Sequence, residues 1–176
     1  MRIELEWVGP IKLKEQKTAG YSFEVIEEQL EAQPAIYVFA RQFGKSYSPI
    51  YIGQAANAWA RLRTQFNNLK LMERVKHWNP KDPTDPSLKI NGARVLFIGY
   101  LARPKTATQT GAALRIAERA LIEHALTEGH AIVNIQMTKT KYDEITSYGA
   151  KASASFSPRA MLVKAQTKTA KAKSAA

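Results

Sequence analysis

The chain has 176 residues, 45% of them hydrophobic, no cysteine and a formal net charge of +11. This length and apolar content predict one folded domain with terminal extensions. The lack of cysteine excludes disulfides, thiolate metal sites and a cysteine nucleophile, and it fits a reducing cytosol, so we expect a cytoplasmic protein. No apolar run approaches the roughly 18 residues of a membrane helix, and the first residues lack the apolar stretch of a secretory signal.

The basic surplus is spread unevenly along the chain. Residues 139–176 hold eight Lys or Arg against Asp143 and Glu144, so this stretch carries +6 of the total charge. A surplus of this kind attracts polyanions and indicates a nucleic-acid partner. Two plainer interpretations remain, namely a charge that serves solubility and a basic tail that docks on an acidic partner.

The first part of the chain predicts three strands and a short helix. Residues 2–8 alternate between apolar and polar side chains, as in a strand with one buried face. A short acidic helix is expected over residues 21–30. Residues 35–41 and 50–53 are rich in β-branched and aromatic side chains, and they predict an antiparallel hairpin joined by a longish loop over residues 43–49.

One long helix is expected after the hairpin, with Asn57 as its N-cap and Asn79-Pro80 as its end. Its apolar residues keep helical spacing. The predicted buried stripe consists of Trp59, Leu62, Phe66, Leu69 and Met72. Three prolines within residues 80–86 predict a loop. Residues 93–102 are apolar on both faces and predict a strand in the middle of its sheet.

The second half of the chain predicts one strong helix. Residues 103–111 are polar and loop-like, whereas residues 112–128 are dominated by helix formers, with Gly129 suited to the C-terminal cap. The expected apolar face of this helix consists of Leu114, Ala117, Leu121 and Ala125. A short apolar stretch over residues 131–136 follows. Beyond residue 140 the pattern fades, and we expect residues 164–176 to be disordered.

This order of elements predicts an α+β fold. A small antiparallel three-stranded sheet, in the order β-β-α-β-α, is flanked by helices, with an extra N-terminal strand and a basic C-terminal tail. The corresponding boundaries are an N-terminal extension over residues 1–33, a central domain over residues 34–140, and a partly disordered basic extension over residues 141–176.

Four side chains on these elements form a set with obvious chemistry. Tyr37 and Tyr51 lie on the two hairpin strands, Arg61 on the helix that follows, and Glu118 on the late helix. Phenols, a guanidinium and a carboxylate are sufficient for metal-dependent cleavage of a phosphodiester. Each residue also has an ordinary interpretation, since tyrosines are common in strands, and helical Arg and Glu are usually solvated or ion-paired.

The spacing of these residues resembles the GIY-YIG nuclease superfamily over about residues 34–136. The strings that carry the resemblance are Ala35-Ile36-Tyr37, Tyr51-Ile52-Gly53, Arg61 ten residues after the second tyrosine, Glu118-Arg119-Ala120-Leu121-Ile122, and Asn134 in Ile132-Val133-Asn134. Five motifs occur in the family's order, each on the element expected for it. The resemblance implies a metal-dependent endonuclease that hydrolyses phosphodiester bonds in DNA by a one-metal mechanism.

The resemblance also implies a role for each residue. Glu118 would hold one Mg²⁺ or Mn²⁺ ion, which normally retains several waters. Arg61 would neutralise charge on the phosphate in the transition state. Tyr51 would act as the general base or position the attacking water, and Tyr37 would hold Tyr51 or the water by a hydrogen bond. Gly53 and Asn134 would support the site.

Three positions depart from the family's pattern. Ala35 replaces the first glycine, which a strand tolerates. Gln54 stands where many members carry Lys or Ser, and Gln65 stands where many carry His or Tyr. We expect these two glutamines, with the basic residues Lys70 and Arg74, to contact nucleic acid.

The departures motivate a second hypothesis, a catalytically impaired nucleic-acid-binding module with the same fold. In both cases DNA is expected in preference to RNA, and a protein partner would supply sequence specificity. The third hypothesis is a structural protein whose basic tail binds an acidic partner.

Overall fold

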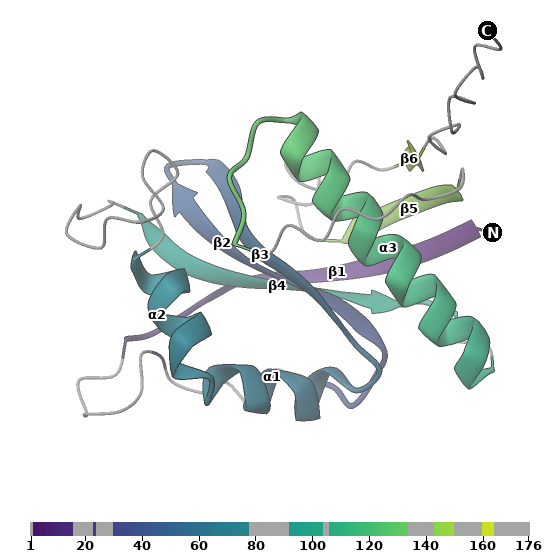
Figure 1. Cartoon of the computed structure of the whole chain (residues 1–176), viewed down its shortest axis with the longest axis horizontal. Helices are drawn as coiled ribbons and strands as arrows, with labels where there is room; N and C mark the ends of the chain where they lie inside the picture. The colour runs from purple at the N-terminus through teal and green to yellow at the C-terminus, as the bar shows by residue number, and fades with distance from the viewer. Residues whose placement is uncertain are drawn as a thin grey trace, which may run out of the picture.

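Six strands form one sheet in the computed structural model of the chain, which describes residues 2–15, 23, 30–77, 92–103, 106–133, 143–149 and 160–163. The strand order across the sheet is β3-β2-β4-β1-β5-β6 (Figure 1). The strands are β1 (Arg2–Lys12), β2 (Ala35–Phe43), β3 (Ser46–Ala55), β4 (Ala93–Leu101), β5 (Asp143–Gly149) and β6 (Ala160–Val163). No helix within these described ranges is both long and apolar enough to cross a membrane.

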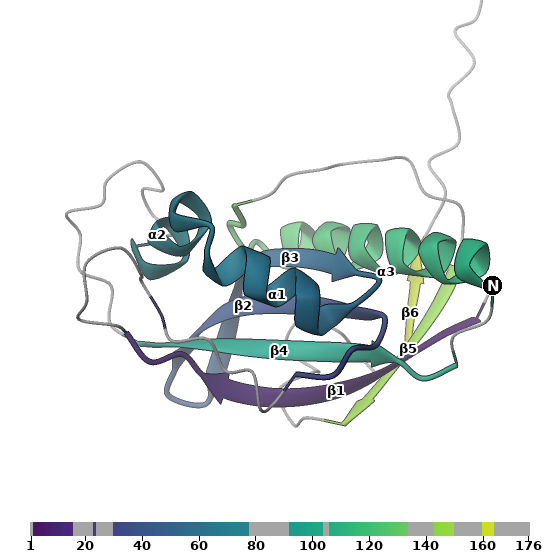
Figure 2. The ribbon, with the colours of Figure 1, turned by 90° about the horizontal axis from the view of Figure 1, so that it is seen from below.

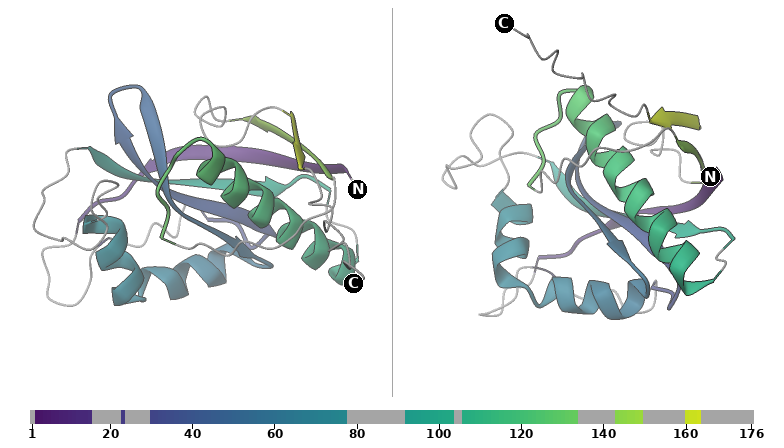
Figure 3. Two further views of the ribbon diagram at one scale, coloured as in Figure 1. Left: turned by 45° about the horizontal axis from the view of Figure 1, so that its top comes forward. Right: turned by 45° about the vertical axis from the view of Figure 1, so that its right-hand side comes forward.

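The predicted α+β class is confirmed and the expected N-terminal strand is present, but the six-stranded sheet is larger than the three strands and one extra strand that were predicted. Strands β3, β2, β4 and β1 are antiparallel neighbours. The N-terminal strand β1 pairs with β4 on one side and runs parallel to β5 on the other. Figure 3 shows β5 and β6 beside β1 near the N-terminus, away from α1 and α2. The strands β5 and β6 lie where the sequence pattern predicted no element.

The hairpin of β2 and β3 is present, with a tighter turn than expected. Only Gly44 and Lys45 separate the two strands, and residues 46–49, predicted to be loop, are part of β3. Gly44 has a φ of +59°, a conformation that glycine adopts without steric cost and that closes a short hairpin. The register shifts between Phe39 and Ala40, where the antiparallel ladder contains an irregularity.

Two helices replace the single long helix predicted after β3. Helix α1 (Ala58–Phe66) begins at Asn57, whose side chain accepts a hydrogen bond from the Ala60 N–H at 3.0 Å, as predicted. Helix α2 (Leu69–His77) begins after Asn68, whose Oδ1 accepts from the Leu71 N–H at 3.2 Å. A side chain that satisfies backbone donors in this way favours a new helix start over continuation.

The break between α1 and α2 also changes which residues are buried. Leu69 was expected in the apolar stripe but is 49% exposed, and Trp59 is only half-buried. Met72 is buried as predicted, and Leu71 and Val75 of α2 are buried in addition. The prediction for Leu69 is wrong because the periodicity restarts at residue 69.

Helix α3 (Ala107–Thr127) begins five residues before the predicted start at residue 112. Thr106 is its N-cap and accepts from the Gln109 N–H at 3.3 Å, so the stretch predicted as loop contributes the first turn. The chain leaves the helix through Gly129, whose φ of +78° suits a helix end. The predicted apolar face, Leu114, Ala117, Leu121 and Ala125, is buried.

Helices cover the two faces of the sheet separately. Helix α3 packs on a core that includes Leu5 of β1, Val38 of β2 and Phe97 of β4. Helices α1 and α2 pack on the opposite core, which includes Phe39 of β2 and Ile98 of β4. Figure 2, seen from below Figure 1, shows α1 on the near side of the sheet and α3 on the far side. Strand β3 forms one edge of the sheet and lies between these two layers.

Arg94 of β4 secures the end of α2. Its guanidinium is buried and donates to the carbonyl oxygens of Val75 and Lys76 at 2.8 Å each, and to that of Gly92 at 3.0 Å. The carbonyls at a helix C-terminus lack intrahelical partners and carry partial negative charge. Arg94 therefore supplies both hydrogen bonds and compensating charge where α2 meets the sheet.

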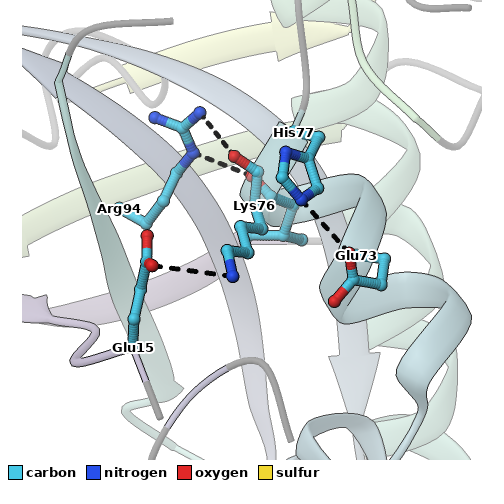
Figure 4. A network of polar contacts seen from close by, with 6 residues as sticks. Glu15, Glu73, Lys76, His77 and Arg94 are labelled. Atoms are coloured by element: carbon cyan, nitrogen blue, oxygen red, sulfur yellow. Dashed lines mark hydrogen bonds and ion pairs between the residues drawn. The ribbon is translucent and has the colours of Figure 1, made fainter. Parts of the chain in front are cut away.

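Figure 4 shows the Arg94 contacts together with two further contacts of α2, both of which are more exposed to solvent. Lys76 Nζ lies 3.6 Å from Glu15 Oε2, and His77 Nε2 lies 3.2 Å from Glu73 Oε2. Solvated pairs of this kind add little stability. The buried Arg94 is thus the main polar attachment of α2.

Several expectations lie outside the described residues. They are most of the helix expected over residues 21–30, the proline-rich loop over residues 80–86, Asn134, and the disordered tail over residues 164–176. The segment after α3 is described as far as Val133 and forms no strand there.

We predict that Arg94→Met lowers the free energy of unfolding by about 3 kcal/mol, because it leaves buried carbonyl groups without a donor. Arg94→Lys should recover only part of this loss, since one ammonium cannot reproduce the forked contacts. Urea unfolding measures the effect. The control is Arg103→Met, whose wild-type side chain is 83% exposed, and which should change stability by less than about 0.5 kcal/mol. Equal effects of the two Met variants would contradict the role of Arg94.

Candidate functional site

The four side chains singled out from the sequence lie around the edge strand β3. Tyr37 and Tyr51 belong to the core layer that packs under α1, and Arg61 extends from α1 itself. Glu118 lies on α3, which covers the opposite face. The site therefore has two halves, one in each layer, which meet where β3 ends the sheet.

Gly53 makes room for Tyr37. The two residues are directly opposite each other in the β2–β3 register. A Cβ atom on residue 53 would lie 2.5 Å from both Cζ and Oη of Tyr37, which is closer than atoms can approach. The Tyr37 ring thus crosses over the backbone of Gly53, and only glycine permits this position.

The two phenols stack within an aromatic group. The rings of Tyr37 and Tyr51 are 6.0 Å apart with an interplanar angle of 22°, and Phe39 packs edge-on against Tyr37 at 5.9 Å. Burial raises the pKa of Tyr37 well above its ordinary value, and the neighbouring Tyr51 adds to the rise. Tyr37 is therefore a neutral phenol that can donate a hydrogen bond to Tyr51.

Arg61 is held by Gln65, one helical turn further along α1. In the amide orientation that satisfies both groups, Gln65 Oε1 accepts from Arg61 Nε at 3.0 Å and from Arg61 Nη2 at 2.9 Å. Gln65 is buried, whereas Arg61 is exposed. The positive charge of the nearby Arg61 guanidinium partly offsets the rise in the pKa of Tyr37.

Glu118 is half-buried and is held by Gln54 of β3. Gln54 Nε2 donates to Glu118 Oε2 at 3.0 Å. Burial raises the pKa of the Glu118 carboxyl, while the Gln54 hydrogen bond, Arg119 and Arg61 act against this rise.

Arg61 connects the two halves electrostatically. Its positive charge lowers the pKa of Tyr37 on the α1 side and the pKa of Glu118 on the α3 side. Coulomb interactions between partly exposed groups fall off within about 8 Å at physiological ionic strength. One guanidinium therefore acts on a phenol from one layer and a carboxylate from the other.

The other predicted site residues have different positions. Lys70 and Arg74 are exposed on α2, one turn apart, beyond the end of α1. Asn134 lies outside the described residues. Its predecessor Val133 donates its backbone N–H to the carbonyl of Ile50 at 2.7 Å, so the segment after α3 returns to the edge strand next to Tyr51.

The donor set at Glu118 fits one hard cation. Among the described residues no three His, Cys, Asp or Glu side chains gather as a metal site. A single carboxylate is nevertheless a normal protein ligand for Mg²⁺, which keeps most of its waters. A partly desolvated carboxylate with a raised pKa also gains from a nearby cation, because the cation stabilises the ionised form.

Two clefts among the described residues lie away from this group. The larger, about 260 Å³, is lined by Arg2 and Glu4 of β1 and by Gln109 and Thr110 of α3. The smaller, about 60 Å³, is lined by Arg41 and His130, among others. Neither includes Tyr51, Arg61 or Glu118, so the candidate site is identified by its chemistry rather than by the volume of a cavity.

The sequence predicted that Gln54 and Gln65 lie at the site and contact nucleic acid. In the structure each amide holds a charged member of the group: Gln54 holds Glu118, and Gln65 holds Arg61. The spacing of four residues on a helix could have indicated the second pair. No local signal could have indicated the first, because 64 residues separate Gln54 from Glu118.

Comparison of the chain with protein-family models, with curated protein sequences and with solved structures found no significant match.

We predict that Gly53→Ala lowers the free energy of unfolding by about 1–3 kcal/mol, because the new methyl group displaces the Tyr37 ring. Denaturant unfolding and the near-UV circular dichroism of tyrosine measure the effect. The matched control is Gly111→Ala on α3, where the nearest neighbour of an added Cβ is 3.6 Å away. Helix propensity predicts that this control is stabilised by about 0.5–1 kcal/mol. A Gly53→Ala protein as stable as wild type would contradict the prediction, because the Tyr37 ring could then shift without cost.

Glu118→Gln should make the fold more stable at neutral pH. Burial raises the pKa of the Glu118 carboxyl in the folded protein above its pKa in the unfolded chain. The stabilising contribution of the protonated carboxyl is therefore complete at pH values below the unfolded-state pKa, and it is lost as the pH rises through the folded-state pKa. A glutamine cannot ionise and keeps the shape. The Tm advantage of Glu118→Gln over wild type should therefore be largest near pH 8 and vanish toward about pH 4. Glu123→Gln, on the same helix, is the control for net charge, and an equal pH-dependent advantage there would contradict the prediction.

Proposed function

We propose that the protein is a metal-dependent endonuclease of the GIY-YIG type that hydrolyses phosphodiester bonds in DNA. The observation that carries this proposal is the position of Arg61, whose charge acts both on Tyr37 of the stacked phenol pair and on Glu118. Two stacked tyrosines, an arginine and a partly buried carboxylate are brought together from three elements, α1, α3 and the β2–β3 hairpin.

Each residue has a definite task in the proposed reaction. Tyr37 stays neutral because it is buried, and its hydroxyl orients Tyr51. Tyr51 is half-buried at the sheet edge, where it positions the attacking water or, as the tyrosinate, accepts its proton. Arg61 neutralises the charge that develops on the phosphate oxygens.

The carboxylate half of the site binds and orients. Glu118 would hold one Mg²⁺ or Mn²⁺ ion through its carboxylate, and the hydrogen bond from Gln54 keeps the carboxylate in a fixed orientation. The bound ion supplies Lewis-acid stabilisation of the phosphate and the leaving oxygen. The exposed Lys70 and Arg74 on α2 would contact the backbone of the nucleic acid without reading its sequence.

A specific observation favours a second candidate, a nucleic-acid-binding module without turnover. Both charged members of the site are already engaged within the protein: Gln65 occupies two N–H groups of Arg61, and Gln54 occupies one oxygen of Glu118. Groups held in this way bind an anion or a cation less readily if the amides must first be displaced. This candidate predicts salt-sensitive binding that Glu118→Gln does not weaken.

Plasmid nicking in the presence of Mg²⁺ or Mn²⁺ tests the proposal. Wild type should nick, and EDTA should abolish the reaction. Glu118→Gln and Arg61→Ala should each lose about a hundredfold or more in rate, a typical loss when one charge-stabilising group is removed. Arg63→Ala is the matched control, because Arg63 lies on the same helix but packs over the Trp59 ring at 4.8 Å. Its rate should stay within about threefold of wild type.

The outcomes separate the hypotheses. Nicking that persists in Glu118→Gln would reveal a contaminant and sink the nuclease proposal. Salt-sensitive DNA binding without nicking under any metal would establish the binding module instead. Equal losses in Arg61→Ala and Arg63→Ala would remove Arg61 from its proposed role.

A further inference from the structure

Gln65 combines two properties that are unusual for a helical glutamine. It is only 5% exposed, and its single carbonyl oxygen accepts from two nitrogen atoms of Arg61. A buried amide oxygen without a donor would cost about 1–3 kcal/mol, so Arg61 satisfies a need of Gln65. Gln65 also orients Arg61, because two hydrogen bonds to one acceptor fix the plane of a guanidinium that is otherwise exposed.

The geometry of α1 makes this contact rigid. Positions four apart on a helix lie on the same face, and Gln65 is enclosed by the packing under α1. Its neighbours Leu62 and Phe66 are fully buried, so the backbone that carries the amide is fixed by the core. Arg61 is thereby oriented from its Nε end, and its remaining N–H groups can bind an anion.

We propose that Gln65 is a positioning residue for Arg61, which it holds in the orientation that acts on the substrate phosphate. Resting on the proposed nuclease function, this inference assigns Gln65 to the protein's own site rather than to contact with nucleic acid. A neutral amide is well suited to the task. It orients the guanidinium without cancelling its charge, whereas a carboxylate at residue 65 would compete with the phosphate.

A double-mutant cycle in kcat tests the role. Gln65→Met keeps the approximate volume but has no strong acceptor, and it should lower kcat by about tenfold or more. In the Arg61→Ala background the same substitution should change kcat by less than about twofold, because Gln65 acts only through Arg61. Additive losses in the two backgrounds would overturn the proposal. Gln109→Met, the same substitution at an exposed position of α3, is the control and should leave kcat unchanged.

A measurement independent of activity separates this inference from the proposed function. The Nε–H resonance of Arg61 in a ¹⁵N correlation spectrum, assigned by its loss in Arg61→Lys, should be protected from solvent exchange in wild type. Gln65→Met should expose it to fast exchange. Gln65→Glu, which retains an acceptor of the same shape, should keep it protected. Equal exchange in wild type and Gln65→Met would refute the contact, whether or not the protein cleaves DNA.

If Gln65→Met fails to fold, as judged by circular dichroism, Gln65→Glu decides the matter alone. Its carboxylate keeps Arg61 oriented but neutralises its charge, so the Nε–H group should stay protected while kcat falls. Protection lost in Gln65→Glu would contradict the inference. A wild-type protein that shows a protected Nε–H group but no nuclease activity would refute the proposed function and leave the contact established.

Discussion

The passage of the Tyr37 ring over the backbone of Gly53 is the contact on which the candidate site depends. The ring belongs to the core, where it packs between Phe39 and Tyr51, but its hydroxyl interacts with Arg61. A side chain at residue 53 would occupy the same space. The same contact therefore determines both the packing of the core and the geometry of the site, so a change in one alters the other.

The edge position of β3 explains how two separate layers contribute to one site. Interior strands of a sheet keep the two faces apart, whereas an edge strand allows side chains from both faces to approach each other. Tyr51 and Gln54 lie on β3 and serve the α1 side and the α3 side respectively. Each charged group then has an amide from its own side, Gln65 for Arg61 and Gln54 for Glu118. Neutral amides thus hold both charged side chains, and the charge of Arg61 acts on groups in both layers.

Local patterns in the sequence predicted the elements that depend on local forces. Alternation identified β1, apolar character identified the central position of β4, and Asn57 identified the start of α1. Prediction was wrong where capping competed with periodicity, since Asn68 starts a new helix inside an uninterrupted apolar pattern. Strand β5 was missed because its place in the sheet depends on β1, a partner some 140 residues earlier in the chain.

The candidate site shows the same division. The types and order of Tyr37, Tyr51, Arg61 and Glu118 were available from the sequence. The partners of the two glutamines were not, because amide pairing follows from the fold and not from residue type.

The location of β1 has a consequence for how the protein is made. This strand is synthesised before both of its partners, since Leu5 pairs with Leu101 of β4, and the other neighbour, β5, is synthesised later still. The apolar side chains of the nascent strand therefore stay uncovered until β4 and β5 have been synthesised. Sheet completion is a late and non-local step, which slows folding relative to structures built from adjacent segments.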